Sequence, residues 1–135
     1  MTTMQEKIGK MGLYLVNGVA GNEGMPGAPL LHFSLLVDAP TGKVTGHAVQ
    51  TQAVAPPSNE IKINDVTGMV RATGLGKLTK IVALQGTAYI PFPPPAIGES
   101  VVPFSAHFAV DEAWNGVGGW SLGSTSVEDV PVKSE

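Results

Sequence analysis

Cysteine is absent from the 135-residue chain. A disulfide framework, a cysteine-based zinc site and a thiol nucleophile are therefore excluded. A chain without cysteine is typical of the cytosol, but it is also compatible with export. We favour a cytoplasmic location and keep open export without a cleaved signal peptide.

Charge of either sign is scarce. Charged residues make up 14% of the chain and the formal net charge is −3. Nucleic-acid binding requires concentrated positive charge, so we expect no nucleic-acid partner. No apolar run approaches the roughly 20 residues of a membrane helix. Residues 1–10 lack the apolar centre of a signal peptide, and we expect them to form a flexible segment.

The sequence also lacks the apolar spacing of an amphipathic helix. Glycine (17 residues) and proline (11 residues) fall in clusters, and short alternating runs lie between the clusters. This pattern predicts an all-β fold, namely a seven-stranded, mainly antiparallel β-sandwich or flattened β-barrel. We expect a single β domain over residues 11–123, followed by a flexible C-terminal tail over residues 124–135.

Two alternating runs predict a hairpin with a defined register. Leu31, Phe33, Leu35 and Val37 share one face of a strand, and a turn at 39–42 leads into a second run. Matching the apolar faces places Val37 opposite Val44 and Phe33 opposite Ala48. The expected core comprises Leu31, Phe33, Leu35, Val37, Val70, Val82, Leu84, Phe104, Phe108 and Trp120.

Two local irregularities are also predicted. The parity of the apolar positions reverses at Asn64–Asp65, which indicates a bulge within one long strand. The dipeptide Asn115–Gly116 is typical of a tight two-residue turn between strands.

Four glycines at three-residue intervals mark the segment Gly18–Pro29. The segment is too short for a collagen helix, and it lacks the Lys-Ser/Thr pair of a phosphate-binding loop. We predict a surface loop between the first two strands. If the domain binds a ligand at this end, the candidate contact residues are Asn22, Glu23 and Met25.

A second candidate contact surface is the proline-rich segment Pro91–Ala96. It resembles a polyproline II ligand, but it links two strong strands, so a stiff connection is the preferred interpretation. The candidate contact residues here are Phe92, Pro93 and Pro94.

Catalytic motifs are weak. Residues Gly119–Gly123 match the G-x-S-x-G pattern of serine hydrolases, but no histidine follows Ser121 in the chain. The predicted register makes His32 and His47 diagonal neighbours, a weak candidate pair for a metal that lacks a third ligand. We therefore predict no catalytic residue, no metal and no cofactor.

The stretch GLYLVNGVAGNEGMPGAPLLHFSLLVDAPTGKVTGHAVQTQ and the distal GGWSLG carry a family resemblance. The whole chain resembles a small bacterial family of single-domain all-β proteins known only as a domain of unknown function. The resemblance implies a soluble bacterial β domain, and it implies no activity, ligand or catalytic residue.

Three functional hypotheses follow. The leading one is a non-enzymatic binding or protein-interaction module with an unknown protein or small-molecule partner. The alternative is a carrier of a small apolar ligand in a barrel interior. The third is a metal-dependent or acid–base enzyme that uses His32 and His47. The oligomeric state stays open.

Overall fold

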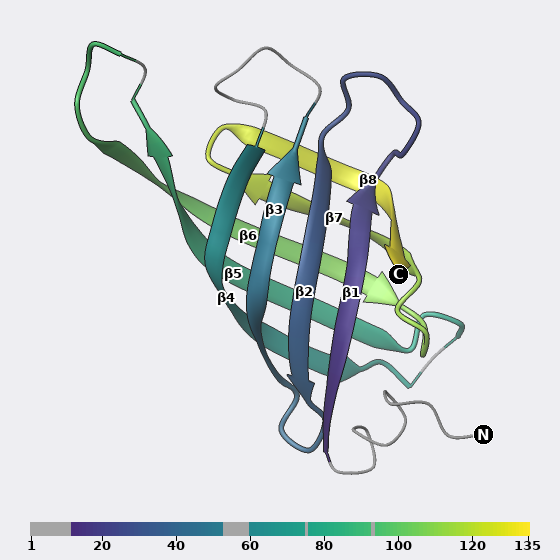
Figure 1. Cartoon of the computed structure of the whole chain (residues 1–135). Coiled ribbons are helices and arrows are strands. Elements are labelled where there is room, and N and C mark those ends of the chain that lie inside the picture. Colours follow the sequence, from purple (N-terminus) through teal and green to yellow (C-terminus); the bar gives the residue numbers. More distant parts are fainter. Residues whose placement is uncertain (1–11, 53–59, 75, 93) are drawn as a thin grey trace.

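The computed structural model describes residues 12–52, 60–74, 76–92 and 94–135, which form a closed barrel of eight antiparallel strands (Figure 1). Each strand pairs with its neighbours in sequence, and β8 closes the barrel against β1. The barrel form of the predicted fold is thereby confirmed. The strands are β1 (Leu13–Gly21), β2 (Leu30–Asp38), β3 (Lys43–Thr51), β4 (Glu60–Ala72), β5 (Lys80–Pro91), β6 (Glu99–Val110), β7 (Gly116–Leu122) and β8 (Thr125–Ser134).

Strand β8 corrects two expectations, the count of seven strands and the flexible tail over residues 124–135. It pairs with both β7 and β1, and Val132 lies opposite Gly116 on one side and Ala20 on the other. Val130 and Val132 are buried, whereas the polar residues between and around them face outward. The segment is polar because only one face of the strand is covered. The predicted flexible segment 1–10 lies outside the described residues.

Alternating side chains from all eight strands fill the barrel interior. All the expected core residues are buried except Val70, which is partly buried and packs against the others. The rings of Phe33 and Phe108 meet there with their centroids 5.3 Å apart. An eight-stranded barrel has an interior that side chains can fill, as they do here.

The predicted hairpin register and bulge are both confirmed. Val37 lies opposite Val44, and Phe33 lies opposite Ala48. Between β3 and β4 the register shifts, because β4 contains one more residue than β3 over the same length, at residues 64–65. The reversal of parity in the sequence therefore marks a real β-bulge.

The glycine-rich loop is shorter than expected, because Gly18 and Gly21 belong to β1. A Cβ atom at Gly18 would lie 2.5 Å from Cζ of Phe33 and 2.5 Å from the Lys133 carbonyl oxygen. Glycine at this position therefore leaves room for a core ring and for β8. The connection between β1 and β2 comprises only residues 22–29.

The predicted two-residue turn at Asn115–Gly116 is wrong. Gly116 already pairs with Val110, so the connection spans residues 111–115. The Asp111 amide donates to the Asn115 carbonyl at 2.9 Å, and Trp114 adopts a left-handed conformation with φ 64°. The longer turn folds the Trp114 side chain into the barrel, where it is buried.

The two ends of the barrel therefore differ. Connections β2–β3, β4–β5 and β6–β7 lie at one end, where the buried Trp114 closes the interior. The β1–β2 and β7–β8 connections and the β5–β6 hairpin lie at the opposite end, which we call the mouth (Figure 1). The glycine-rich loop and the proline-rich segment both belong to the mouth.

Candidate functional site

The barrel wall divides at the mouth, between β4 and β5. These strands pair only from Thr67–Gln85 to Ala72–Lys80. Beyond that point β5 continues to pair with β6 as far as Pro91–Glu99, while β4 pairs only with β3. We call the hairpin of residues 86–92 and 94–103 the arm. Its base still packs on the barrel, where Ala88 is buried, and its outer part projects away (Figure 1).

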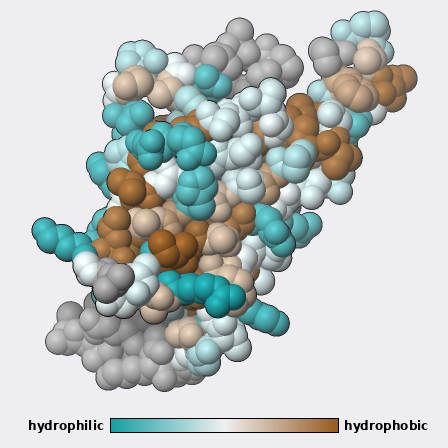
Figure 2. Space-filling model, turned by 180° about the vertical axis from the view of Figure 1, so that it is seen from behind, coloured by the Kyte–Doolittle hydropathy of each residue, from teal (hydrophilic) through white to brown (hydrophobic). Residues whose placement is uncertain are grey.

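A cleft of about 1050 Å³ lies between the arm and the mouth. In Figure 2 hydrophobic surface continues from the barrel onto the projecting arm at the upper right. Three of the residues around the cleft are charged, and the others are apolar or uncharged polar. The residues that line it are Gln50, Gln52, Glu60, Ile61, Lys62, Asn64, Tyr89, Ile90, Pro91, Phe92, Pro94, Glu99, Val102, Leu122, Gly123, Ser124 and Thr125. Apolar walls with a few polar groups are typical of small-molecule sites.

Gln50 and Leu122 are the two buried residues that line this cleft, and they therefore mark its inner end. Gln50 is also the single buried polar residue in the described part of the chain. The Trp120 indole Nε1–H donates to Gln50 Oε1 at 2.8 Å. Strands β3 and β7 lie on opposite sides of the eight-stranded barrel, so this bond crosses the interior. An indole nitrogen can only donate, so the bond fixes the orientation of the amide, with its oxygen toward Trp120.

The amide nitrogen of Gln50 is left without a protein partner within the described ranges. Every fully enclosed side-chain nitrogen or oxygen there has a hydrogen-bond partner. The Gln50 nitrogen is therefore not fully enclosed, and because Gln50 lines the cleft, we infer that this nitrogen faces the cleft. The cleft thus has N–H donors at its inner end.

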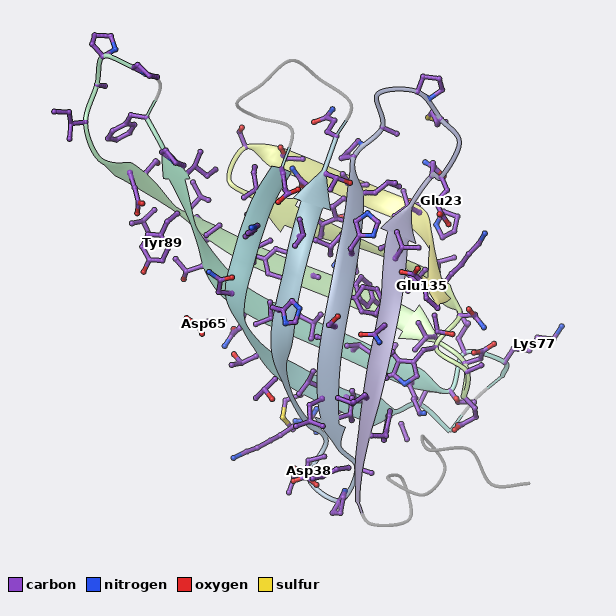
Figure 3. All side chains as sticks on the ribbon, viewed as in Figure 1. Glu23, Asp38, Asp65, Lys77, Tyr89 and Glu135 are labelled. Atoms are coloured by element: carbon purple, nitrogen blue, oxygen red, sulfur yellow. The ribbon has the colours of Figure 1, made fainter. Side chains whose placement is uncertain are left out.

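The arm supplies the outer wall of the cleft. Tyr89 projects from the arm, as labelled in Figure 3, and lies opposite Val101 in the hairpin. Phe92 and Pro94, which the sequence singled out as contact residues, both line the cleft. Pro93 lies outside the described residues. The arm thus brings the proline-rich segment to the mouth.

The glycine-rich loop contributes less. Met25 is exposed and lines a shallow hollow of about 610 Å³, which adjoins the cleft through the shared residues Gln52 and Glu60. Asn22 and Glu23 line neither hollow; the Glu23 carboxylate lies 3.8 Å from Lys133 Nζ on the surface. Of the three predicted loop residues, only Met25 therefore lines the adjoining hollow, and none of them lines the cleft.

The predicted histidine pair faces the outside of the barrel wall. His32 lies opposite Val49 and His47 opposite Ser34, so the diagonal relation is as expected. His32 Nε2 lies 3.3 Å from Thr51 Oγ1. No cluster of three or more histidine, aspartate or glutamate side chains suited to a metal occurs among the described residues. Neither histidine lines the cleft.

A further outer contact was missed from the sequence. His107 Nε2 lies 3.1 Å from the Glu128 carboxylate, and both side chains are exposed. The sequence could not indicate this pair, because the predicted tail over residues 124–135 places Glu128 on no strand. Ser121 lies on the same outer surface, yet no hydrogen bond joins it to His107 in the described structure, and its strand leads into a β-turn instead of the helix that a hydrolase requires.

The fold and the cleft define the class: an eight-stranded up-and-down β-barrel with a cleft at its mouth. The chain belongs to the family described as Domain of unknown function (DUF1842), which matches residues 11–126. A comparison with curated proteins gave no match. Within the described ranges, no helix has the length and apolar character needed to cross a membrane.

Proposed function

We propose that the protein is a non-enzymatic binding module that takes its ligand in the cleft at the barrel mouth. The observation that supports this proposal is a cleft whose walls combine apolar side chains with polar ones, among them the amide of the buried Gln50. Concave, mostly apolar sites with few polar groups are the usual form of a ligand pocket. The arm and β4 supply those walls from two sides.

The alternative of an apolar ligand inside the barrel has less support. Large side chains, among them Phe33, Phe108 and Trp120, are buried in the interior. A ligand there would have to displace them, whereas a ligand at the mouth would not. The enzyme hypothesis has less support again, because His32 and His47 lie on the outer wall, away from the cleft.

Binding of the fluorescent apolar probe N-phenyl-1-naphthylamine tests the proposal. Phe92→Ser removes an aromatic ring from the cleft, and we expect it to weaken probe binding about tenfold, which corresponds to about 1.4 kcal/mol. Ile81→Ser is the matched control. Ile81 is 46% exposed and Phe92 44%, but Ile81 lies on the barrel wall, outside the cleft.

The two variants should unfold cooperatively at similar temperatures. Equal loss of probe binding in both variants, or no probe binding to the wild type, would contradict the assignment of the cleft as a ligand site.

A further inference from the structure

We infer that the cleft selects an uncharged, mainly apolar small molecule carrying a carbonyl oxygen, which accepts a hydrogen bond from the Gln50 side-chain amide. This inference rests on the proposed function, because it names the ligand class of the same cleft. It is carried by the hydrogen-bonding geometry of Gln50 and Trp120 and by the charges at the rim.

The donor at the inner end sets the polar requirement. The Trp120 indole donates to the amide oxygen of Gln50. The group that Gln50 offers to the cleft is therefore its NH₂ group, which is a hydrogen-bond donor. A ligand that places a hydrocarbon group against this nitrogen leaves a largely buried donor unpaired, which is unfavourable. A ligand oxygen at the same place satisfies it.

The remaining inner surface requires an apolar body. Ile61, Ile90, Val102 and Leu122 line the cleft together with the ring of Phe92. Burying hydrocarbon against such walls is favourable by about 25 cal/mol per Å². The ligand therefore combines a hydrophobic body with one acceptor that reaches Gln50.

The charges at the rim favour a neutral acceptor over a carboxylate. Glu60, Lys62 and Glu99 are the charged residues around the cleft. Lys62 Nζ lies 3.8 Å from a Glu60 carboxylate oxygen, so its charge is already partly balanced. Glu99 has no ion-pair partner among the described residues. An anionic ligand would meet net negative charge, which opposes its binding.

Three naphthalene probes of similar size separate these requirements: 2-acetylnaphthalene, 2-ethylnaphthalene and 2-naphthoate. We expect the ketone to bind the wild-type protein about tenfold more tightly than the ethyl compound, because the ketone accepts one hydrogen bond that the ethyl compound cannot. The naphthoate should bind more weakly than the ketone. Binding is followed by two-dimensional NMR, and the ketone should shift the Gln50 side-chain NH₂ signal more than the ethyl compound does.

Two variants isolate the amide nitrogen. Trp120→Phe removes the internal donor but keeps the Gln50 amide, so it should retain the preference for the ketone. Adding Gln50→Met to that background removes the amide without stranding an indole N–H, and the preference should disappear. Each variant is first checked for cooperative thermal unfolding, and the wild-type NMR comparison needs neither variant.

The outcomes are distinct. Equal binding of the ketone and the ethyl compound to the cleft overturns the carbonyl requirement but leaves the proposed function standing. Tighter binding of the naphthoate than of the ketone overturns the neutral ligand class. Absence of binding by all three compounds overturns the inference and the proposed function together.

Discussion

Position 18 leaves no space for a side chain. A Cβ atom there would lie 2.5 Å from both Cζ of Phe33 and the Lys133 carbonyl oxygen, and the second of these belongs to the backbone of β8. We expect Gly18→Ala to lower the free energy of unfolding by about 1–3 kcal/mol, as overpacking of a core does. Urea denaturation measures the change.

Gly24→Ala is the control for this substitution. Gly24 has φ +82° and no atom within 4 Å of an added Cβ. Its cost should therefore be conformational only, about 1 kcal/mol. A larger loss of stability for Gly24→Ala than for Gly18→Ala would contradict the steric explanation.

Single residues also show where sequence reasoning stops. The hairpin register depends on neighbouring apolar faces, so it could be predicted and is confirmed. The role of Gln50 could not be predicted, because its partner Trp120 lies 70 residues away and across the barrel. The sequence shows that Gln50 is a polar residue on the apolar face of its strand. Its hydrogen-bond partner, Trp120, comes within reach only when the barrel closes.

At the scale of elements, β8 closes the barrel, and its buried valines distinguish it from a tail. We expect Val132→Asp to lower the free energy of unfolding by more than 3 kcal/mol, because Val132 is fully enclosed between β1 and β7 and a lone buried charge is costly. Chemical denaturation of the full chain measures the loss.

The neighbouring substitution Lys133→Asp is the matched control. Lys133 is exposed and lies 3.8 Å from Glu23, so this substitution replaces a surface ion pair with two exposed carboxylates and leaves the buried face of β8 unchanged. Exposed pairs contribute about 0–1 kcal/mol. Similar effects of the two substitutions would mean that the inward side of β8 is not buried.

The strands also differ in how well the sequence marks them. β6 shows uninterrupted alternation from Val102 to Val110 and was predicted with its core face. In β8 the alternation is broken at residues 128–129, because β8 has one more residue than β7 where the register shifts between Gly118 and Trp120. Such irregularities remove the period-two signal although the strand still pairs on both sides.

Prolines limit pairing along the arm, where β5 and β6 extend beyond their barrel neighbours. Pro91 and Pro103 have no N–H group, so neither can donate to an additional strand. The Pro103 carbonyl instead accepts the Gly123 amide at 3.1 Å. The sequence predicted a stiff proline connection, but the separation of the arm from β4 required the three-dimensional register.

For the whole molecule, the two ends of the barrel have different roles. At the closed end, Trp114 packs edge-on against Tyr14 with ring centroids 6.5 Å apart, and Lys80 Nζ lies 5.6 Å from the Tyr14 ring. These contacts stabilise the barrel at its closed end, whereas the cleft lies at the mouth. A substitution at the closed end should therefore change stability without changing ligand binding directly.

Glu112 joins two connections at the closed end. Its carboxylate accepts a hydrogen bond from Thr79 Oγ1 at 2.8 Å and lies 3.3 Å from Lys80 Nζ. The Thr79 hydrogen bond, followed by the charge of Lys80, lowers the pKa of Glu112 below its ordinary value. The folded state therefore favours the ionised carboxylate more than the unfolded chain does.

The lowered pKa of Glu112 fixes the sign of a pH effect. Its contribution to stability is complete above the unfolded pKa of about 4.3, and it is lost as the pH falls through the lower folded value. At pH 7 we expect wild type to melt slightly above Glu112→Gln, and this difference should shrink as the pH falls below about 4.3. The effect is small because the Glu112 side chain is 77% exposed, and added salt should reduce it further by screening Lys80. Thermal melts from pH 7 to pH 3 measure it, and a difference that grows toward acid pH would show that this contact does not favour the ionised carboxylate.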